Sequence, residues 1–362
     1  MQLSQYISVF KKNINIYFPR LFTGPLLLHI DITNRCNLKC QHCDVWKFKL
    51  KKDLDFKVFK KLIDEATALG LKFIAISGGE PLLHKDILKF ISYSKKKGIY
   101  INLSTNGILL SDYFINNFKT LKLDSMTISM ESIGENYDVL RGSKGNYPKL
   151  INNLRKLKKK KLNVHIGVCI TDHNFKDLPN LLYTLNKMRI YKIHFYPFYY
   201  SPRNVNKNHI LYEKRKKIGK IFTKNEINNY KKIVKKLSRN KNLDLISKLI
   251  LRKSIGYFEG KKISFKDIPC YAPLFSAVIG FDGDVSPCWY STKIMGNIYK
   301  DNFKSIWYSK DFSKIKNQIR NKYCSLTQNN CLITQREISA RIDILFLIKN
   351  YGLNFFSKYT LR

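Results

Sequence analysis

The chain is short of acidic residues. It carries 26 Asp and Glu against 66 Lys and Arg, which gives a formal net charge of +40 over 362 residues. Two explanations fit this imbalance: an anionic partner, or a compositional bias toward Lys, Asn and Ile. Bias accounts for the abundance of Lys but not for the shortage of acids. Because net charge governs association and solubility rather than fold, both explanations stay open.

Long hydrophobic runs are also missing. No apolar stretch reaches the ~18 residues that would span a bilayer. Residues 1–20 mix apolar and basic side chains without a small-residue cleavage site, so no secretory signal is expected. The sequence therefore predicts a protein that is made and kept in the cytoplasm. In that compartment its eight cysteines indicate metal or redox chemistry rather than structural disulfides.

Three of the cysteines follow directly on a short apolar strand. Cys36, Cys40 and Cys43 have the spacing CxxxCxxC. Three thiolates do not complete the four-ligand set that zinc or an ordinary cubane iron–sulfur cluster requires. A cluster held in this way keeps one iron open to another ligand. The alternative is a zinc site with a fourth ligand elsewhere, for which His42 is the one candidate nearby.

A glycine-rich run, Ser77-Gly78-Gly79-Glu80-Pro81, ends a second apolar strand about thirty-five residues further on. Together with the three cysteines, this run resembles the radical S-adenosylmethionine (radical SAM) superfamily. The resemblance implies a 4Fe–4S cluster whose open iron is chelated by SAM. It also implies reductive cleavage of SAM to a 5′-deoxyadenosyl radical, which removes a hydrogen atom from the substrate. An external donor of low-potential electrons is then required.

Apolar strands alternate with amphipathic helices after Pro25, which is typical of parallel βαβ units. Six strands are too few to close the usual eight-stranded barrel, and they match the partial (β/α)6 barrel of the radical SAM superfamily. The fold class is therefore α/β, with chemistry expected at the carboxyl ends of the strands. The predicted strands are 26–32, 71–77, 99–104, 125–130, 163–170 and 191–196. The predicted helices are 56–69, 85–97, 111–118, 147–161 and 175–188.

Several other residues are candidates for SAM binding. Gly78 and Gly79 let the backbone approach the cofactor closely, and the resemblance implies that the Glu80 side chain receives a hydrogen bond from the SAM ammonium group. Asn106 follows the third strand. Cys169, within the fifth strand, is expected to be an inert core thiol.

The end of the fourth strand resembles a segment of peptide-maturing radical SAM proteins. There the resemblance implies that Ser129 meets the ribose and Arg141 pairs with the SAM carboxylate, since Arg binds carboxylates in bidentate fashion. Glu131 departs from the Asp that this family usually has. His42 stands where the family usually has a ring near the adenine, although a surface position is equally open.

A second cysteine group lies near the C-terminus. Cys270, Gly283 and Cys288 form the pattern C-x12-G-x4-C, and Cys324 and Cys331 follow. This resembles the SPASM and Twitch auxiliary-cluster domains. Four thiolates suffice for one additional iron–sulfur cluster, which we expect to be a 4Fe–4S cluster, so Twitch is the closer resemblance. The wide spacing of the last two cysteines departs from the pattern, and a structural zinc site stays open.

These patterns divide the chain into five segments. The region from residue 201 to 262 carries 19 basic against 4 acidic residues, a net of +15, with helical apolar spacing around Lys231, Lys232, Lys235 and Lys236. We expect these helices to bridge two domains and to favour an anionic partner near the substrate entrance. The segments are an extension (1–24), a radical SAM core (25–200), a basic helical bridge (201–266), an auxiliary-cluster domain (267–335) and an amphipathic C-terminal helix (336–362). That last helix is expected to pack on the core, while its basic flanks leave membrane contact open.

Three functions are compatible with the sequence. The first is a maturase that modifies a peptide or protein, and the second is an enzyme that dehydrogenates a small metabolite such as a sugar or alcohol. The third is a non-enzymatic, basic nucleic-acid-binding protein with structural zinc. The cysteine and glycine motifs favour the enzymes, so nucleic acid is not the expected partner.

Overall fold

The computed structural model describes residues 24–198, 222–260, 272–289, 291 and 293–320. Each end of the six predicted strands falls within two residues of the observed end. Three further strands follow near the C-terminus. The strands are β1 (Leu27–Asp31), β2 (Phe73–Ser77), β3 (Tyr100–Thr105), β4 (Ser125–Ser129), β5 (Val164–Ile170), β6 (Ile193–Pro197), β7 (Ser276–Ile279), β8 (Asp284–Ser286) and β9 (Gly296–Asn297).

The five predicted helices are also present, and a short helix after β4, α5, was not expected. Three 3₁₀ helices, η1 to η3, complete the described elements. The α-helices are α2 (Phe56–Ala68), α3 (Ile87–Lys96), α4 (Asp112–Thr120), α5 (Gly134–Arg141), α6 (Asn146–Lys159), α7 (Leu178–Lys187), α9 (Lys224–Leu237), α10 (Leu245–Phe258), α11 (Ala272–Phe275), α12 (Phe303–Trp307) and α13 (Lys310–Arg320). The 3₁₀ helices are η1 (Val45–Lys47), η2 (Pro81–Leu83) and η3 (Phe175–Asp177).

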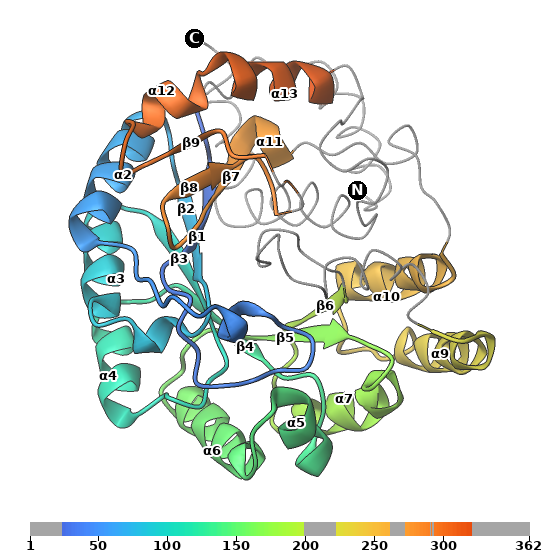
Figure 1. Cartoon of the computed structure of the whole chain (residues 1–362). Helices are drawn as coiled ribbons and strands as arrows, with labels where there is room; N and C mark the ends of the chain where they lie inside the picture. Colours follow the sequence, from blue (N-terminus) through green and yellow to red (C-terminus); the bar gives the residue numbers. More distant parts are fainter. Residues whose placement is uncertain (1–23, 199–221, 261–271, 290, 292, 321–362) are drawn as a thin grey trace, which may run out of the picture.

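All described strands belong to one open sheet in the order β6-β5-β4-β3-β2-β1-β7-β8-β9. β1 to β6 run parallel to their neighbours. Figure 1 shows α2, α3, α4, α6 and α7 in an arc around the outside of the sheet. The partial α/β barrel that the sequence predicts is confirmed.

The helices form where apolar spacing and capping residues agree. The Asp55 side chain caps α2 by accepting hydrogen bonds from the amides of Lys57 and Val58, and Ser111 caps α4 in the same manner. The buried positions of α2, such as Phe59 and Leu62, recur at helical spacing and face the sheet core. Local sequence and burial therefore specify the same helices.

The two faces of β1 to β6 differ in polarity. Side chains that point outward, such as Ile30, Leu103 and Ile166, are buried among the helices. The alternate positions point into the concave face, where most side chains are half-buried. Many of these are polar: His29, Asp31, Ser77, Asn102, Ser104, Thr127, Ser129, His165, Cys169, His194 and Tyr196. The interior of the partial barrel is thus a polar surface rather than a packed apolar core.

The C-terminal hairpin continues the same sheet. β7 pairs in parallel with β1, and β7 and β8 form the antiparallel hairpin that the Asp282-Gly283 turn predicts. Gly283 has φ of +84°, and a Cβ atom there would lie 2.4 Å from the Tyr299 ring. This hairpin of the predicted auxiliary-cluster domain covers the open edge of β1, where an exposed strand would leave backbone donors and acceptors without partners.

The basic helices α9 and α10 pack on the last parallel strand. The Ser247 hydroxyl of α10 donates to the Ile193 carbonyl oxygen of β6 at 2.5 Å. Phe222, Tyr230 and Phe258 form a buried aromatic cluster between the two helices. The two helices cover the β6 edge of the barrel (Figure 1). Whether they also bridge two domains stays a prediction.

No helix among the described residues is both long and apolar enough to cross a membrane. The predicted N-terminal extension and the predicted helix at 336–362 lie outside the described residues, apart from Gly24.

Candidate active site

The loop after β1 carries the three predicted ligand cysteines. The pKa of Cys36 is raised to about 11 and that of Cys43 to about 12, mainly by burial and to a smaller extent by the neighbouring thiols. The Cys43 amide donates to the Cys40 carbonyl oxygen at 3.2 Å, which turns the chain between the two side chains. Cys40 is buried, whereas Cys36 and Cys43 are half-buried. Among the described residues, no three Cys, His, Asp or Glu side chains are already arranged to hold a metal ion. A bound metal centre would remove the protons that burial otherwise retains on these thiols.

The glycine-rich loop after β2 lies directly against the cysteine loop. The Gly79 amide donates to the Thr33 carbonyl oxygen at 2.7 Å, and the Glu80 amide donates to that of Arg35 at 2.8 Å. A Cβ atom at Gly78 would lie 2.4 Å from the Thr33 oxygen, and one at Gly79 would lie 2.2 Å from the Arg35 oxygen. Among the described contacts, the close packing of the two loops is therefore what requires glycine at both positions. The sequence alone did not reveal this packing.

Glu80 is fully buried beneath this loop. Its carboxylate accepts hydrogen bonds from the Thr105 hydroxyl at 2.6 Å, the Asn106 amide at 2.8 Å and the Leu82 amide at 3.1 Å. Burial raises the pKa of Glu80, and these hydrogen bonds oppose the rise. A carboxylate has about four acceptor sites, so one site is left for a cofactor donor such as an ammonium group.

Asn106 connects the end of β3 to the cysteine loop. Its side-chain amide donates to the Asn37 side-chain oxygen at 2.8 Å. Ser129 lies on the concave face at the end of β4, the strand that pairs directly with β3. The predicted cofactor residues of β2, β3 and β4 thus gather at one edge of the sheet.

Arg141, at the end of α5, reaches into the same region. Its guanidinium forms a buried ion pair with Glu131, and Nη1 lies 3.5 Å from the Cys40 sulfur. The Arg141 Nε and the Tyr137 hydroxyl are buried without a hydrogen-bond partner among the described residues. A buried polar atom without a hydrogen-bond partner lowers the stability of the fold. A bound polar group, such as the carboxylate of SAM, would supply the missing partner.

His42 lies beside this ion pair. Burial lowers the pKa of His42 to about 4, with Glu131 raising it and Arg141 lowering it by smaller amounts. The ring is therefore neutral at physiological pH, and the residue is half-buried.

Three residues on the concave face were not recognised as part of the site. Burial raises the pKa of Cys169, and Glu131, Arg141 and Cys43 also affect it. Cys169 thus faces the site rather than the apolar core that we expected. His165 of β5 and His194 of β6 share a hydrogen bond of 2.7 Å between Nδ1 and Nε2. In the sequence, these three residues alternate with aliphatic residues that are buried. This alternation places the three side chains on the concave side of the sheet.

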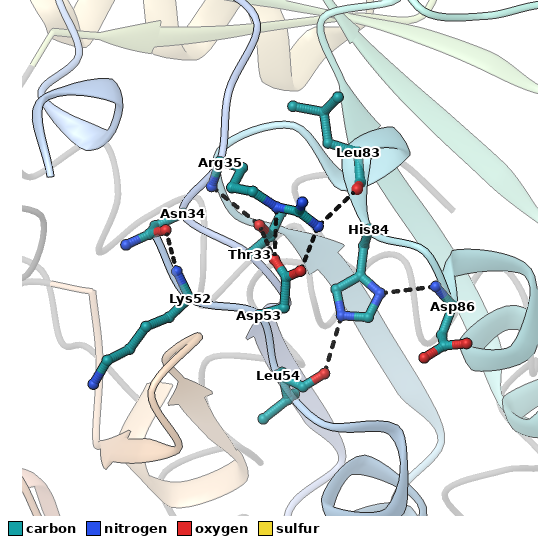
Figure 2. Close-up of polar contacts among 9 residues, drawn as sticks. All are labelled: Thr33, Asn34, Arg35, Lys52, Asp53, Leu54, Leu83, His84 and Asp86. Atoms are coloured by element: carbon teal, nitrogen blue, oxygen red, sulfur yellow. Dashed lines mark hydrogen bonds and ion pairs between the residues drawn. The ribbon is translucent and has the colours of Figure 1, made fainter. Parts of the chain in front are cut away.

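A clamp of polar side chains holds the cysteine loop in place (Figure 2). The Asp53 carboxylate accepts hydrogen bonds from the Thr33 hydroxyl at 2.6 Å and from Arg35 Nε at 3.1 Å, and it forms an ion pair with the same guanidinium. Arg35 Nη2 also donates to the Leu83 carbonyl oxygen at 3.0 Å, just after the glycine-rich loop. Arg35 therefore links the two loops through its side chain as well as its backbone.

A second part of this clamp fixes the strand-like segment that carries Asp53. The Lys52 amide donates to the Asn34 side-chain oxygen at 2.8 Å. His84 accepts from the Asp86 amide at Nδ1, so its Nε2 carries the proton and donates to the Leu54 carbonyl oxygen at 3.0 Å.

We expect Asp53→Ala to lower the free energy of unfolding by about 1.5–3 kcal/mol, because it removes charge-assisted hydrogen bonds of Thr33 and Arg35. Urea denaturation measures this loss. The matched control is Asp112→Ala, which breaks the exposed Lys156 pair and should cost about 0–1 kcal/mol. Equal losses in the two variants would contradict a special role for the clamp.

The second cysteine group is only partly within the described residues. Cys270, Cys324 and Cys331 lie outside them. Cys288 is half-buried just after β8. Whether the four cysteines meet at one centre therefore stays a prediction.

Comparison with known proteins identifies two domains. Residues 30–184 match the family model "Radical SAM superfamily", and residues 270–332 match the SPASM model, described as an iron–sulfur cluster-binding domain. The first match covers both loops of the site, and the second covers all four C-terminal cysteines. The second match favours iron–sulfur over structural zinc.

Individual relatives agree with these matches. The chain is 30% identical over 197 residues to the Fe-coproporphyrin III synthase of Methanosarcina barkeri, which covers 53% of this chain and 49% of the relative. It is 24% identical over 161 residues to the PqqA peptide cyclase of Xanthomonas oryzae pv. oryzae, covering 44% of this chain and 43% of the relative. The chain thus spans about half the length of these curated relatives.

The fold has solved counterparts. The structure of Streptococcus suis SuiB bound to its precursor peptide SuiA superposes with a TM-score of 0.59 at 16% identity, over 88% of this chain and 70% of that one. Family models and fold therefore lead to the same assignment. The chain therefore combines a domain of the radical SAM superfamily with an iron–sulfur cluster-binding domain of the SPASM type.

Proposed function

We propose that this enzyme is a maturase, which modifies a peptide or protein. The observation that carries the core chemistry is the pairing of two loops. Backbone hydrogen bonds from Gly79 and Glu80 hold the glycine-rich loop against the loop of the three cysteines. This pairing supports a site in which a cluster held by the cysteines would lie beside the groups that would bind SAM.

The proposal assigns a role to each of the three cysteines and to Arg141. Cys36, Cys40 and Cys43 would hold the cluster. Arg141 would pair with the SAM carboxylate, and its hydrogen bond to Cys40 would stabilise a thiolate.

The remaining candidates surround the rest of SAM. Glu80 would accept from the SAM ammonium group with its remaining lone pair, while Gly78, Gly79 and Asn106 shape the loop around it. Ser129 would meet the ribose, and the neutral His42 ring would lie near the adenine.

When bound, the cluster and SAM supply a 5′-deoxyadenosyl radical that removes a hydrogen atom from the substrate. The chain's own part is to orient the substrate and exclude water. The polar concave face offers hydrogen-bonding side chains for this purpose. The hydrogen-bonded pair of His165 and His194 adds two imidazole rings to this face.

The C-terminal cysteines Cys270, Cys288, Cys324 and Cys331 would hold one auxiliary cluster, which suits an overall oxidation of the substrate. An external low-potential donor would supply electrons. Because such clusters and thiols require reducing conditions, we place the enzyme in the cytoplasm. The proposed domain limits are 25–200 for the core, 201–266 for the basic helices and 267–335 for the auxiliary domain.

The substrate class rests on the domain pairing and on the peptide cyclase relative. The match to an Fe-coproporphyrin III synthase favours a second candidate, an enzyme that acts on a small molecule. A sugar or alcohol dehydrogenase belongs to this same class.

Co-expression with each short reading frame next to the gene, followed by mass spectrometry of the recovered peptide, tests the proposal. A maturase of the oxidising type should remove two hydrogen atoms from one of these peptides, and the Cys40→Ala enzyme should leave that peptide unchanged. If a small molecule stimulates deoxyadenosine formation and no peptide does, the second candidate is correct.

A further inference from the structure

We propose that the cleft between α9 and α10 binds an acidic segment of the peptide substrate, an inference that rests on the proposed maturase function. The cleft has a volume of about 340 Å³. Its walls carry four cations, Lys231, Lys235, Arg239 and Arg252. Val234 and Ile255 provide apolar surface between them.

Among the described residues, one acid, Glu259, forms an ion pair with a cation of this cleft. Lys231 pairs with Glu259 at 2.5 Å, and Arg252 Nε donates to the neutral Ser238 hydroxyl at 3.4 Å. The residues that line the cleft include no acid. Like charges four residues apart on a helix repel each other, although the C-terminal end of α9 offsets part of this repulsion. An anionic occupant would relieve the rest.

The side chains that line the cleft favour one class of anionic partner over the others. None of the cleft residues is aromatic, so bases of a single-stranded nucleic acid find no ring on which to stack. Long Lys and Arg side chains beside an aliphatic floor suit carboxylate side chains that alternate with apolar ones. This chemistry describes an acidic, partly apolar peptide.

The position of the cleft relates it to the active site. Ile255 faces the cleft, whereas Tyr257, two residues later on α10, lies on the opposite side of the helix. The Tyr257 hydroxyl donates to the Phe198 carbonyl oxygen at 3.1 Å, just after β6. Burial raises the pKa of Tyr257, and the Cys169 thiol raises it further, so Tyr257 is close to the concave face.

The width of one helix therefore separates the cleft from the site. An α-helix with its side chains is about 10–12 Å wide, and an extended residue spans about 3.3 Å. The acidic segment should accordingly lie at least three to four residues from the residue that is modified.

Fluorescence anisotropy tests the cleft in the reconstituted enzyme without reductant, so that binding is measured without turnover. The probe is a fluorescein-labelled peptide that repeats Glu-Glu-Leu-Ser three times. The cleft variant combines Lys235→Gln, Arg239→Gln and Arg252→Gln. The matched control combines Lys232→Gln, Lys236→Gln and Lys253→Gln, which removes the same charge from neighbouring exposed positions outside the cleft.

At 0.15 M salt the cleft variant should bind about tenfold more weakly, because three exposed charge pairs are lost. The control should change affinity less than about twofold, since charges on other faces are screened over about 8 Å. Equal losses in both variants would show that the charge is background. Failure of the peptide to bind, or a stronger cleft dependence for single-stranded DNA or tripolyphosphate, would also overturn the inference. A cooperative thermal unfolding transition would confirm that each variant is folded.

The outcome is independent of the substrate test. Cleft-dependent binding of the acidic peptide stands even if co-expression finds no modified peptide. A modified peptide that binds equally well to the cleft variant would instead refute the cleft and retain the maturase.

Discussion

A Cys40→Ala enzyme should form no 5′-deoxyadenosine above background when it is reconstituted with iron and sulfide and reduced with dithionite. Cys40 is 6% exposed, and its sulfur lies 3.5 Å from Arg141 Nη1. Losing this thiolate removes one of three protein ligands and the contact to Arg141 together. Cys36→Ala and Cys43→Ala should have the same effect, because three thiolates leave no spare ligand.

Cys169→Ala provides the matched control for this prediction. Cys169 faces the same region from β5 but is not part of the CxxxCxxC motif. Its replacement should preserve both iron content and deoxyadenosine formation. Undiminished deoxyadenosine production by a well-reconstituted Cys40→Ala enzyme would refute the assignment of the ligands.

Iron analysis separates the two cysteine groups. An enzyme that lacks Cys36, Cys40 and Cys43 together should retain about four irons per chain, the content of one auxiliary cubane. Zinc in place of this iron would contradict the second cluster.

Arg141→Met should have the second large effect. Arg141 and Glu131 are 5% and 3% exposed and form an ion pair. Removing one partner leaves the other charge buried and unpaired, which costs about 3–5 kcal/mol. Urea denaturation of the cluster-free protein measures this loss without reference to catalysis.

The same substitution should also weaken SAM binding. Bidentate pairing between a guanidinium and a carboxylate is a strong contact, and Met does not replace it. Isothermal titration of the reconstituted enzyme with SAM should show at least a tenfold rise in Kd, which corresponds to about 1.4 kcal/mol.

The double variant Glu131→Gln with Arg141→Met separates the two effects. It removes both charges, so much of the lost stability should return while SAM affinity stays low. If the double variant regains SAM affinity along with stability, Arg141 acts through the fold and does not touch the cofactor. Equal stability of Arg141→Met and the parent enzyme would show that the ion pair is not buried in solution.

The sequence predicts the core of this protein well because its signals are local. Alternating apolar strands and amphipathic helices set the βαβ order, and the motifs at Cys36 and Gly78 lie at strand ends, where parallel sheets place their chemistry. Contacts between distant segments are less visible. Glu80 was expected to bind SAM, yet most of its acceptor sites bind Thr105, Asn106 and Leu82.

By itself the sequence determined the superfamily, the partial barrel and the cysteine and glycine loops, since each depends on spacing within a short stretch of chain. The tertiary structure decided which distant residues meet. It placed Asp53 against Arg35, Glu131 against Arg141, and His165 beside His194. It also joined β7 to β1. These pairings depend on strand register and on the order of strands in the sheet, and residues so far apart along the chain share no local pattern.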